Sequence, residues 1–389
     1  MPSQPAWLTY PVMILGVLLA CGGLTGMLAA HARGWSPDPR VLFAVSALFV
    51  LGFVNLTPVG SGDTASYAAY GRLAALGYDP YTTTPDDALQ HTAYFSLISK
   101  SWQNTPSVYG PIATWIQEAA ARIGGDRPWL TIWMVLIFNG LVFLGVGLWL
   151  LLRSGDPVRA TLLWTANPLL IEVLVTGGHV DTLVAAGTIA ALRLSRPGSR
   201  LPGELAAGGV LGVAVATKID AGLVAATIAG CLLAQRRHRA LTVLTGSALF
   251  TAVALYVPFG LSALAPLASV SKLVALPSVW DLPWLAGRAV FGPAATLTAI
   301  GVLWPLLMIA VIVLLFRRVV AAAEPSTAVN LTTIAWIVAA PWAMPWYCTT
   351  GWSALADQEP PTRLVPAGLW LGAVTMVLAL VHSSGGHPW

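Results

Sequence analysis

The sequence predicts an all-helical integral membrane protein with about eleven transmembrane helices. Of its 389 residues, 57% are hydrophobic and only 9% are charged, whereas a soluble domain carries about 25% charged residues. Apolar runs recur along the whole chain, and arginines gather between alternate runs. This composition excludes a cytosolic enzyme, a disordered protein and a disulfide scaffold. The small net charge of +4, with scattered arginines, argues against nucleic acid as a partner.

Each candidate span is a run of about 20 apolar residues, or fewer where a helix is packed inside a bundle. The candidate spans are 10–30, 41–58, 130–152, 159–176, 181–194, 205–217, 220–234, 240–259, 296–316, 328–345 and 364–382. No basic region precedes the first run, so we expect a span there and not a cleaved signal peptide. We therefore expect one transmembrane domain over 1–389, located in the cell membrane as a multi-pass protein.

The arginines predict the orientation of these spans, because cytoplasmic loops are enriched in basic residues. Placing the loop 31–40 in the cytoplasm puts most of the 20 basic residues on that side and most of the 16 acidic residues on the other. The long loop 59–129 then lies outside. Loops of this length are usually functional, so we expect the active site on the external face.

Two helices are expected inside this long external loop. The first, over 64–76, places Tyr67, Tyr70 and Leu73 near one face and is too short to span, so we expect it to lie along the membrane interface. The second runs from Pro111 to Ile123, with an apolar stripe that includes Trp115. Many tryptophans near span ends, among them Trp346 and Trp352, are interpreted as an aromatic belt without a functional role.

Asp63 follows the pair Ser61-Gly62 and precedes the first of these helices. A carboxylate in this place could accept a proton from a substrate hydroxyl. It could also cap the helix, since an acidic residue just before a helix binds its free N–H groups. Spacing alone favours the cap.

Tyrosines stand beside two turn motifs in the same loop. Asp79 and Tyr81 belong to Gly-Tyr-Asp-Pro-Tyr, and Tyr109 precedes Gly-Pro. Asp-Pro and Gly-Pro are typical of turns, and this is the simpler interpretation of Asp79. The tyrosines could also stack on a sugar ring.

Two further groups of ionisable residues interrupt apolar runs at the external side, where such residues are costly and often functional. His179 and Asp181 stand between two spans, where Asp181 could cap a helix. These two residues could bind a metal ion, but two ligands do not make a metal site, so no metal is expected. Lys218 is one of three lysines. It could bind a phosphate, or it could simply pair with Asp220.

Several of these segments together resemble a known family. SGDTASYAAYGRLAALGYDPYTTTP, TPSVYGPIATW, NPLLIEVLVTGGHVDTLVAAG and ATKIDAGLVA occur in the order found in the actinobacterial polyprenol-phosphate-mannose-dependent α-mannosyltransferases. These are multi-span glycosyltransferases of the C type. The resemblance covers about 40–235, and beyond it rests on Pro-Trp-Tyr at 345–347. The chain is shorter than expected for the enzymes that elongate lipoglycans.

The resemblance implies a C-type bundle and a role for each candidate residue. Asp63 would be the catalytic base, which replaces the interpretation as a cap. Lys218, Arg72 and His179 would bind the donor phosphate. The remaining candidates for substrate binding are Tyr67, Tyr70, Asp79, Tyr81, Tyr109 and Asp181. No cofactor is expected.

The implied reaction is an inverting transfer of a sugar, mannose above all, from a polyprenyl monophosphate to an acceptor hydroxyl. The acceptor would be a glycan, a lipoglycan or a secondary metabolite, and membrane lipid would surround the spans. Two alternatives stay open: another lipid-phosphate sugar such as arabinose or glucose, and a transporter or flippase of lipid-linked sugars. The second should show an inverted repeat, which the sequence lacks.

Overall fold

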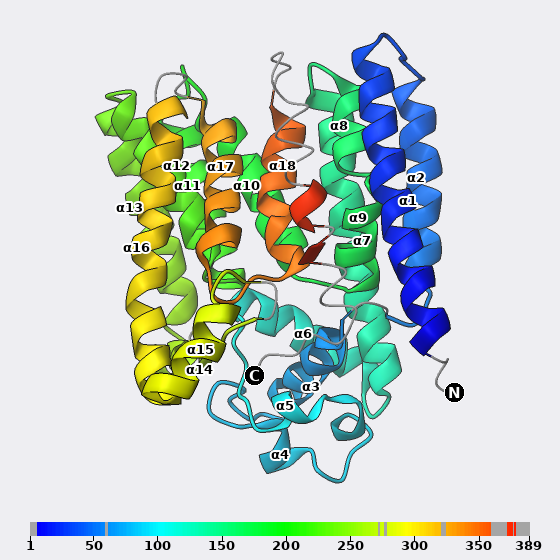
Figure 1. The fold of residues 1–389 in the computed structure, drawn as a ribbon, viewed down its shortest axis with the longest axis vertical. Coiled ribbons are helices and arrows are strands. Elements are labelled where there is room, and N and C mark those ends of the chain that lie inside the picture. Colours follow the sequence, from blue (N-terminus) through cyan, green and yellow to red (C-terminus); the bar gives the residue numbers. More distant parts are fainter. Residues whose placement is uncertain are drawn as a thin grey trace.

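A computed structural model describes residues 6–58, 61–270, 273–275, 278–319, 324–358, 372–375 and 377–378. Over these residues the chain forms helices and connecting loops and contains no strand. Most of the helices stand side by side as a bundle, and a smaller lobe built from α3 to α6 lies at one end (Figure 1). The all-helical prediction is confirmed.

The bundle contains most of the helices. They are α1 (Ala6–Ala32), α2 (Pro39–Phe53), α7 (Pro128–Arg153), α8 (Pro157–Leu163), α9 (Pro168–Leu170), the π-helical segment Ile171–Thr176, α10 (Asp181–Leu194), α11 (Leu201–Thr217), α12 (Ala221–Ala234), α13 (His238–Tyr256), α16 (Pro293–Val319), α17 (Pro325–Ala339) and α18 (Thr349–Asp357). The remaining elements are α3 (Asp63–Ala75), α4 (Pro85–Ala88), α5 (Lys100–Gln103), α6 (Pro111–Gly124), α14 (Ala265–Val270), α15 (Asp281–Phe291) and the 3₁₀ segments Phe95–Leu97, Gly260–Leu264 and Pro345–Cys348.

Every candidate span except 364–382 overlaps helical residues, although 41–58 and 328–345 run past the ends of α2 and α17. Most of 364–382 lies outside the described residues. Five helices in the described part are long and apolar enough to cross a membrane, and three more are shorter but apolar. The number of eleven spans stays a prediction. The candidate span 159–176 is interrupted, because Asn167 caps a new helix that starts at Pro168.

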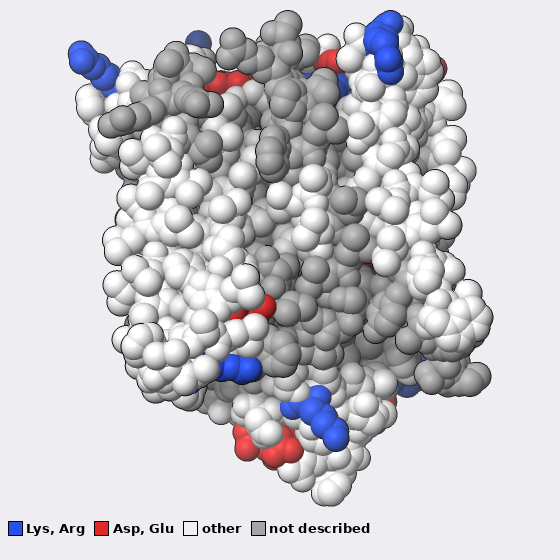
Figure 2. Space-filling model, in the orientation of Figure 1, with Lys and Arg blue, Asp and Glu red and all other residues white. Residues whose placement is uncertain are grey.

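The arginine-bearing loops meet at the end of the bundle away from the lobe. Arg193 donates to the carbonyl of Arg153 over 3.2 Å, and Arg237 donates to the carbonyl of Ser195 over 2.7 Å. Most of the charged side chains in view lie towards the two ends of the molecule, and few lie among the described residues between them (Figure 2). The expectation that these loops share one side therefore agrees with the fold.

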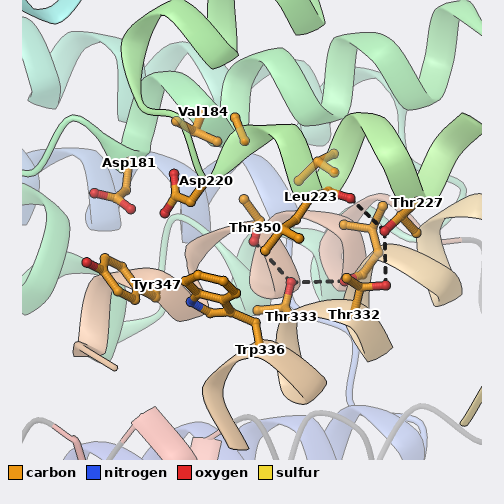
Figure 3. Close-up of a pocket in the computed structure, with 13 residues that line it drawn as sticks. Asp181, Val184, Asp220, Leu223, Thr227, Thr332, Thr333, Trp336, Tyr347 and Thr350 are labelled. Atoms are coloured by element: carbon orange, nitrogen blue, oxygen red, sulfur yellow. Dashed lines mark hydrogen bonds between the residues drawn. The ribbon is translucent and has the colours of Figure 1, made fainter. Parts of the chain in front are cut away.

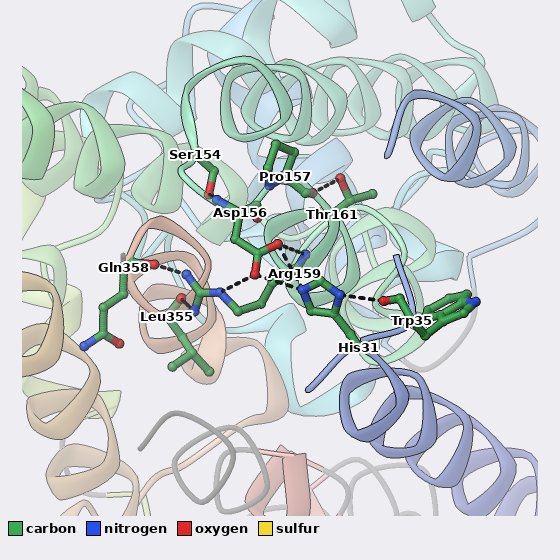
Figure 4. A network of polar contacts seen from close by, with 9 residues as sticks. All are labelled: His31, Trp35, Ser154, Asp156, Pro157, Arg159, Thr161, Leu355 and Gln358. Atoms are coloured by element: carbon green, nitrogen blue, oxygen red, sulfur yellow. Dashed lines mark hydrogen bonds and ion pairs between the residues drawn. The ribbon is translucent and has the colours of Figure 1, made fainter. Parts of the chain in front are cut away.

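A polar network joins three distant parts of the chain at this same end (Figure 4). His31 Nε2 lies 2.8 Å from Asp156 Oδ2, and Asp156 in turn accepts from the backbone N–H of Arg159 over 3.0 Å. The buried Arg159 guanidinium donates to the carbonyls of Leu355 and Gln358. The network ties α1, α8 and the end of α18 together.

The lobe shows how the first helix of the long loop is packed, and the position of this helix at a membrane interface stays a prediction. α3 is buried on nearly all sides and packs mainly against α6 and α7. A methyl group on Gly71 would come within 2.1 Å of the carbonyl oxygen of Gln117, so the two helices touch at their backbones. The buried side of α6 carries small residues such as Ala113 and Ala121, whereas Trp115 of the apolar stripe is 38% exposed. Small side chains let the backbones approach.

The interpretation of the tryptophans as an aromatic belt is wrong for several of them. Trp346 and Trp352 are buried, and the indole N–H of Trp352 donates to Thr375 over 3.2 Å. Trp129, in contrast, is exposed as a belt residue would be. A buried tryptophan beside polar residues has a packing or binding role.

Candidate functional site

Five chain segments meet at the lobe end of the bundle. They are the start of α3, the turn at Tyr109 and Gly110, the loop before α10, the turn between α11 and α12, and the 3₁₀ segment Pro345–Cys348. The backbone N–H of Gly110 donates to the carbonyl of Thr217 over 3.0 Å, which fastens the lobe to the turn that carries Lys218. The site thus lies where lobe and bundle join.

Asp63 is the first residue of α3, and Gly62 occupies the N-cap without a side-chain bond. The Asp63 carboxylate is turned towards the site. Its Oδ2 accepts from the Tyr109 hydroxyl over 3.5 Å and lies 3.8 Å from His179 Nδ1. The side chain is 21% exposed, so a substrate can reach it.

The surroundings of Asp63 favour its neutral form. Desolvation raises the pKa of Asp63 to about 6, against the lowering effects of the Lys218 charge and of the bonds from Tyr109 and Ser61. A carboxylate with a pKa near neutrality is a better general base than one at its usual value, because proton transfer to it is less uphill. Asp63 therefore has both the exposure and the basicity that proton abstraction needs.

His179 is buried behind Asp63 and held from several sides. Its Nδ1 lies 3.0 Å from the Tyr67 hydroxyl. Its ring stacks on Trp346, with 3.7 Å between ring centroids and 17° between planes. The preceding Gly178 has a φ of +63°, a conformation that favours glycine, and its carbonyl accepts from Asn139 over 2.5 Å. The imidazole has a fixed orientation beside the carboxylate.

Lys218 is surrounded by acidic and aromatic groups. Its Nζ lies 2.8 Å from Asp181 Oδ1, 3.5 Å from Asp220 Oδ2 and 4.0 Å from the centroid of the Tyr347 ring. The sequence left open whether Lys218 pairs with Asp220 or binds phosphate. The structure places two carboxylates beside it, and Asp181 is the nearer.

The tyrosines divide into two groups. Tyr67 and Tyr109 pack edge to face beside Asp63, with centroids 4.8 Å apart. Tyr70 adjoins Tyr109 at 6.4 Å between centroids, and its hydroxyl donates to the carbonyl of Thr105. Tyr81 is buried elsewhere, where its hydroxyl lies 2.9 Å from Thr114 Oγ1.

Two predicted site residues have partners away from Asp63. Asp79 accepts from the backbone N–H of Tyr81 over 2.9 Å, as the turn interpretation expects. Arg72 forms an ion pair with Asp126 and lies over the Tyr94 ring. It is nine positions from Asp63 along α3, which is about 14 Å along the helix axis. For the phosphate role of Arg72 the structure offers no geometric support.

Three residues of this site were missed by the sequence analysis as functional residues. They are Asp220, Trp346 and Tyr347. The signal for the last two was the Pro-Trp-Tyr run at 345–347, which the resemblance included but the aromatic-belt interpretation set aside. Among the residues described, no group of three or more His, Cys, Asp or Glu is arranged to hold a metal ion.

Comparisons with known proteins support the family resemblance. The family model described as alpha-(1->6)-mannopyranosyltransferase, N-terminal domain, matches residues 3–235. A probable alpha-(1->6)-mannopyranosyltransferase of Mycolicibacterium smegmatis is 34% identical over 158 residues, which is 38% of this chain and 28% of the relative. Alpha-(1->6)-mannopyranosyltransferase A of Corynebacterium glutamicum is 28% identical over 165 residues, 40% of this chain and 32% of the relative.

A longer alignment extends beyond these segments. Alpha-(1->6)-mannopyranosyltransferase A of Mycobacterium tuberculosis is 26% identical over 376 residues, which is 88% of this chain and 70% of the relative. The first two alignments span about a third of the relatives or less. No solved structure matches the chain. Because the family model covers more than half of the sequence, the chain belongs to the alpha-(1->6)-mannopyranosyltransferase family.

Proposed function

We propose that this protein is a membrane glycosyltransferase that moves mannose from a polyprenyl monophosphate to an acceptor hydroxyl on the external face. The observation that carries the proposal is the setting of Asp63, a partly exposed carboxylate with a raised pKa among fixed polar side chains. Membership of the family and the names of the relatives, all mannopyranosyltransferases, support the choice of sugar.

In the proposed reaction Asp63 accepts the proton of the acceptor hydroxyl. The acceptor oxygen forms a bond to the anomeric carbon, while the bond from that carbon to the phosphate oxygen breaks on the opposite face. The products are the inverted glycoside and polyprenyl phosphate, and the proton stays on Asp63 until solvent removes it. Tyr109 and His179 keep the carboxylate in one orientation, which is the contribution of positioning.

Positive charge near the leaving phosphate would lower the barrier. Lys218 is the lysine whose charge acts on Asp63, so it is the candidate for this role. Its two carboxylate partners offset its charge, so His179, when protonated, would supply the second part of the stabilisation. The polyprenyl chain would lie against the apolar surface of the bundle.

The test replaces Asp63 by Asn, which keeps the size of the side chain but cannot take the proton. Purified protein is given radiolabelled polyprenyl phosphomannose and an oligomannoside acceptor, and the release of polyprenyl phosphate is followed. We expect transfer by Asp63→Asn to fall by about 10² to 10⁴, with donor binding retained. Asp86→Asn, in the same lobe on α4, is the matched control and should keep full activity. Turnover by Asp63→Asn within threefold of the parent would refute the proposed base.

A further inference from the structure

A narrow cavity lies beside the Lys218 turn, between α12 and α17. Its wall includes Asp181 and Asp220 on one side and Tyr347, Trp336, Thr333 and Thr350 on the other (Figure 3). The cavity encloses about 30 Å³. This is enough for a water molecule or for one or two hydroxyl groups of a ligand, and too little for a whole sugar ring.

Three polar atoms of this wall have no hydrogen-bond partner within the protein. They are Asp181 Oδ2, Asp220 Oδ1 and Trp336 Nε1. Asp181 is 5% exposed, so its unpaired oxygen is shielded from bulk water. A buried polar atom without a partner is costly. Three such atoms around one cavity indicate that a polar ligand completes them.

Lys218 determines which carboxylate oxygens of Asp181 and Asp220 are available to a ligand in the cavity. Its ammonium group binds Oδ1 of Asp181 and approaches Oδ2 of Asp220. The other oxygen of each carboxylate is left for the cavity. The arrangement therefore offers two hydrogen-bond acceptors and one donor, the indole N–H, in a fixed geometry.

The charge of the wall selects the kind of ligand. Two carboxylates and one lysine leave about one negative charge at the cavity, which disfavours a phosphate inside it. A metal ion would have to bind beside the Lys218 ammonium, which repels it. Neutral hydroxyl groups are donors to carboxylates without a charge conflict. The rings of Trp336 and Tyr347 add apolar surface for the C–H groups of a sugar. Their centroids lie 6.5 Å apart.

We propose that Asp181, Asp220 and Trp336 form the pocket that recognises hydroxyl groups of the donor sugar. The two carboxylates each accept a hydrogen bond from a sugar hydroxyl, and the indole N–H donates to a sugar oxygen. The ring itself would lie at the mouth of the cavity, next to Lys218 and Asp63. This assignment rests on the proposed function, because it concerns the donor of that reaction, and it separates recognition of the sugar from recognition of the lipid phosphate.

The test compares the binding of two lipids, polyprenyl phosphomannose and polyprenyl phosphate, by titration of the full-length protein in detergent. Asp220→Asn and Trp336→Phe are the test variants, and Trp304→Phe is the matched control, since Trp304 packs on Trp336 but does not line the cavity. Melting curves of every sample accompany the titrations. Asp181 is left intact because its replacement would also release Lys218.

We expect Asp220→Asn to weaken binding of polyprenyl phosphomannose roughly 10-fold to 100-fold, the effect of a charge-assisted hydrogen bond. Trp336→Phe should weaken it by about 5-fold to 10-fold. Both variants should bind the sugar-free lipid phosphate as the parent does. A deoxymannosyl donor that lacks the hydroxyl bound by Asp220 should bind the parent weakly. Its affinity for Asp220→Asn should be no lower than its affinity for the parent.

Two results would overturn the assignment. Equal weakening of both lipids by Asp220→Asn would show that Asp220 acts through Lys218 and not on the sugar. Unchanged binding of polyprenyl phosphomannose in both variants would mean that water alone fills the cavity. Failure of the proposed function is a separate result, seen when the parent protein itself binds neither lipid or when Asp63→Asn keeps full turnover.

Discussion

The imidazole of His179 stacks on the indole of Trp346, with 3.7 Å between the ring centroids. The two residues are far apart in the sequence, and Trp346 lies beyond residues 3–235, which the family model matches. The contact therefore links the family-defining half of the chain to the later helices. His179 in turn approaches Asp63, so the orientation of the proposed base depends on a residue from the other half.

Replacing Trp346 by Leu should lower the rate of transfer about 10-fold or more, because the imidazole loses the surface that fixes its plane. Binding of the donor should change little, since Trp346 does not line the cavity beside Lys218. The measurement is kcat and KM for polyprenyl phosphomannose. Trp342→Leu serves as control. A rise in KM with unchanged kcat would contradict this prediction.

The pH dependence of transfer should reflect Asp63. Desolvation raises the pKa of Asp63 to about 6. A base acts in its ionised form, so kcat/KM should rise with pH through about 6 and level off above it. The stability of the fold should change in the opposite direction and fall as the pH rises. Because the raised pKa favours the neutral form in the folded protein, ionisation weakens the fold as pH rises from about 4 to 6.

Asp63→Asn removes this ionisation, so the variant should melt no lower than the parent at pH 7.5. The two proteins should approach each other in melting temperature near pH 4. The measurement is a melting curve at several pH values beside the pH–rate profile of the parent. A profile that is flat between pH 5 and 7.5 would remove Asp63 from the role of base.

Much of the fold follows from the sequence, because apolar runs in a membrane protein form helices almost by necessity. The candidate spans from 10–30 to 328–345 overlap helices for this reason. The position of α3 does not follow. Its short sequence predicts a helix at the membrane interface and does not predict its burial, which depends on the backbone contact between Gly71 and Gln117, residues from two different helices.

The candidate site was predictable in part. Asp63, His179 and Lys218 stand out as polar residues between apolar runs, and the structure brings all three to one end of the bundle. Arg72 stood in the same segment as Asp63, and only the fold shows its ion pair with Asp126. Local spacing cannot show which partner a long side chain meets across the fold. Trp346 was obscured because tryptophan is common at membrane interfaces.

Transfer should proceed without an added divalent metal. The carboxylates Asp181 and Asp220 flank Lys218, whose ammonium already occupies the place between them. Catalytic metal sites need three or more protein ligands with an open position. The measurement is transfer by protein treated with chelator and then dialysed, with and without Mg²⁺, Mn²⁺ or Ca²⁺. Loss of activity in chelator and recovery with one of these ions would disprove the prediction.

Lys218→Met should destabilise the protein strongly. The change leaves Asp181 and Asp220 without their shared cation, and breaking a buried ion pair from one side costs about 3 to 5 kcal/mol. The double variant Lys218→Met with Asp181→Asn should recover part of the melting temperature, because one of the two orphaned charges is gone. The measurement is a set of melting curves for the parent, both single variants and the double variant.

Donor binding by the stabilised double variant then tests the second role of Lys218. If its charge also serves the lipid phosphate, polyprenyl phosphate should bind this variant roughly 10-fold or more weakly than the parent. Asp181→Asn alone is the control, since it keeps the lysine. Equal affinities in these two variants would leave Lys218 with the ion pairs alone.

Gly110→Ala should disrupt the junction between lobe and bundle. A Cβ at this position would lie 2.2 Å from the carbonyl oxygen of Ala216, a backbone atom that cannot simply move aside. The hydrogen bond from Gly110 N–H to the carbonyl of Thr217 would be strained, and Tyr109 would move away from Asp63. We expect a melting temperature several degrees lower and at least a 10-fold loss of transfer.

Gly62→Ala is the matched control within the same site. Gly62 has a φ of −84°, and a Cβ there meets nothing within 4 Å. Normal stability and transfer in Gly110→Ala would show that the lobe adjusts freely, and the close contact at Gly110 would then have no part in holding the site together.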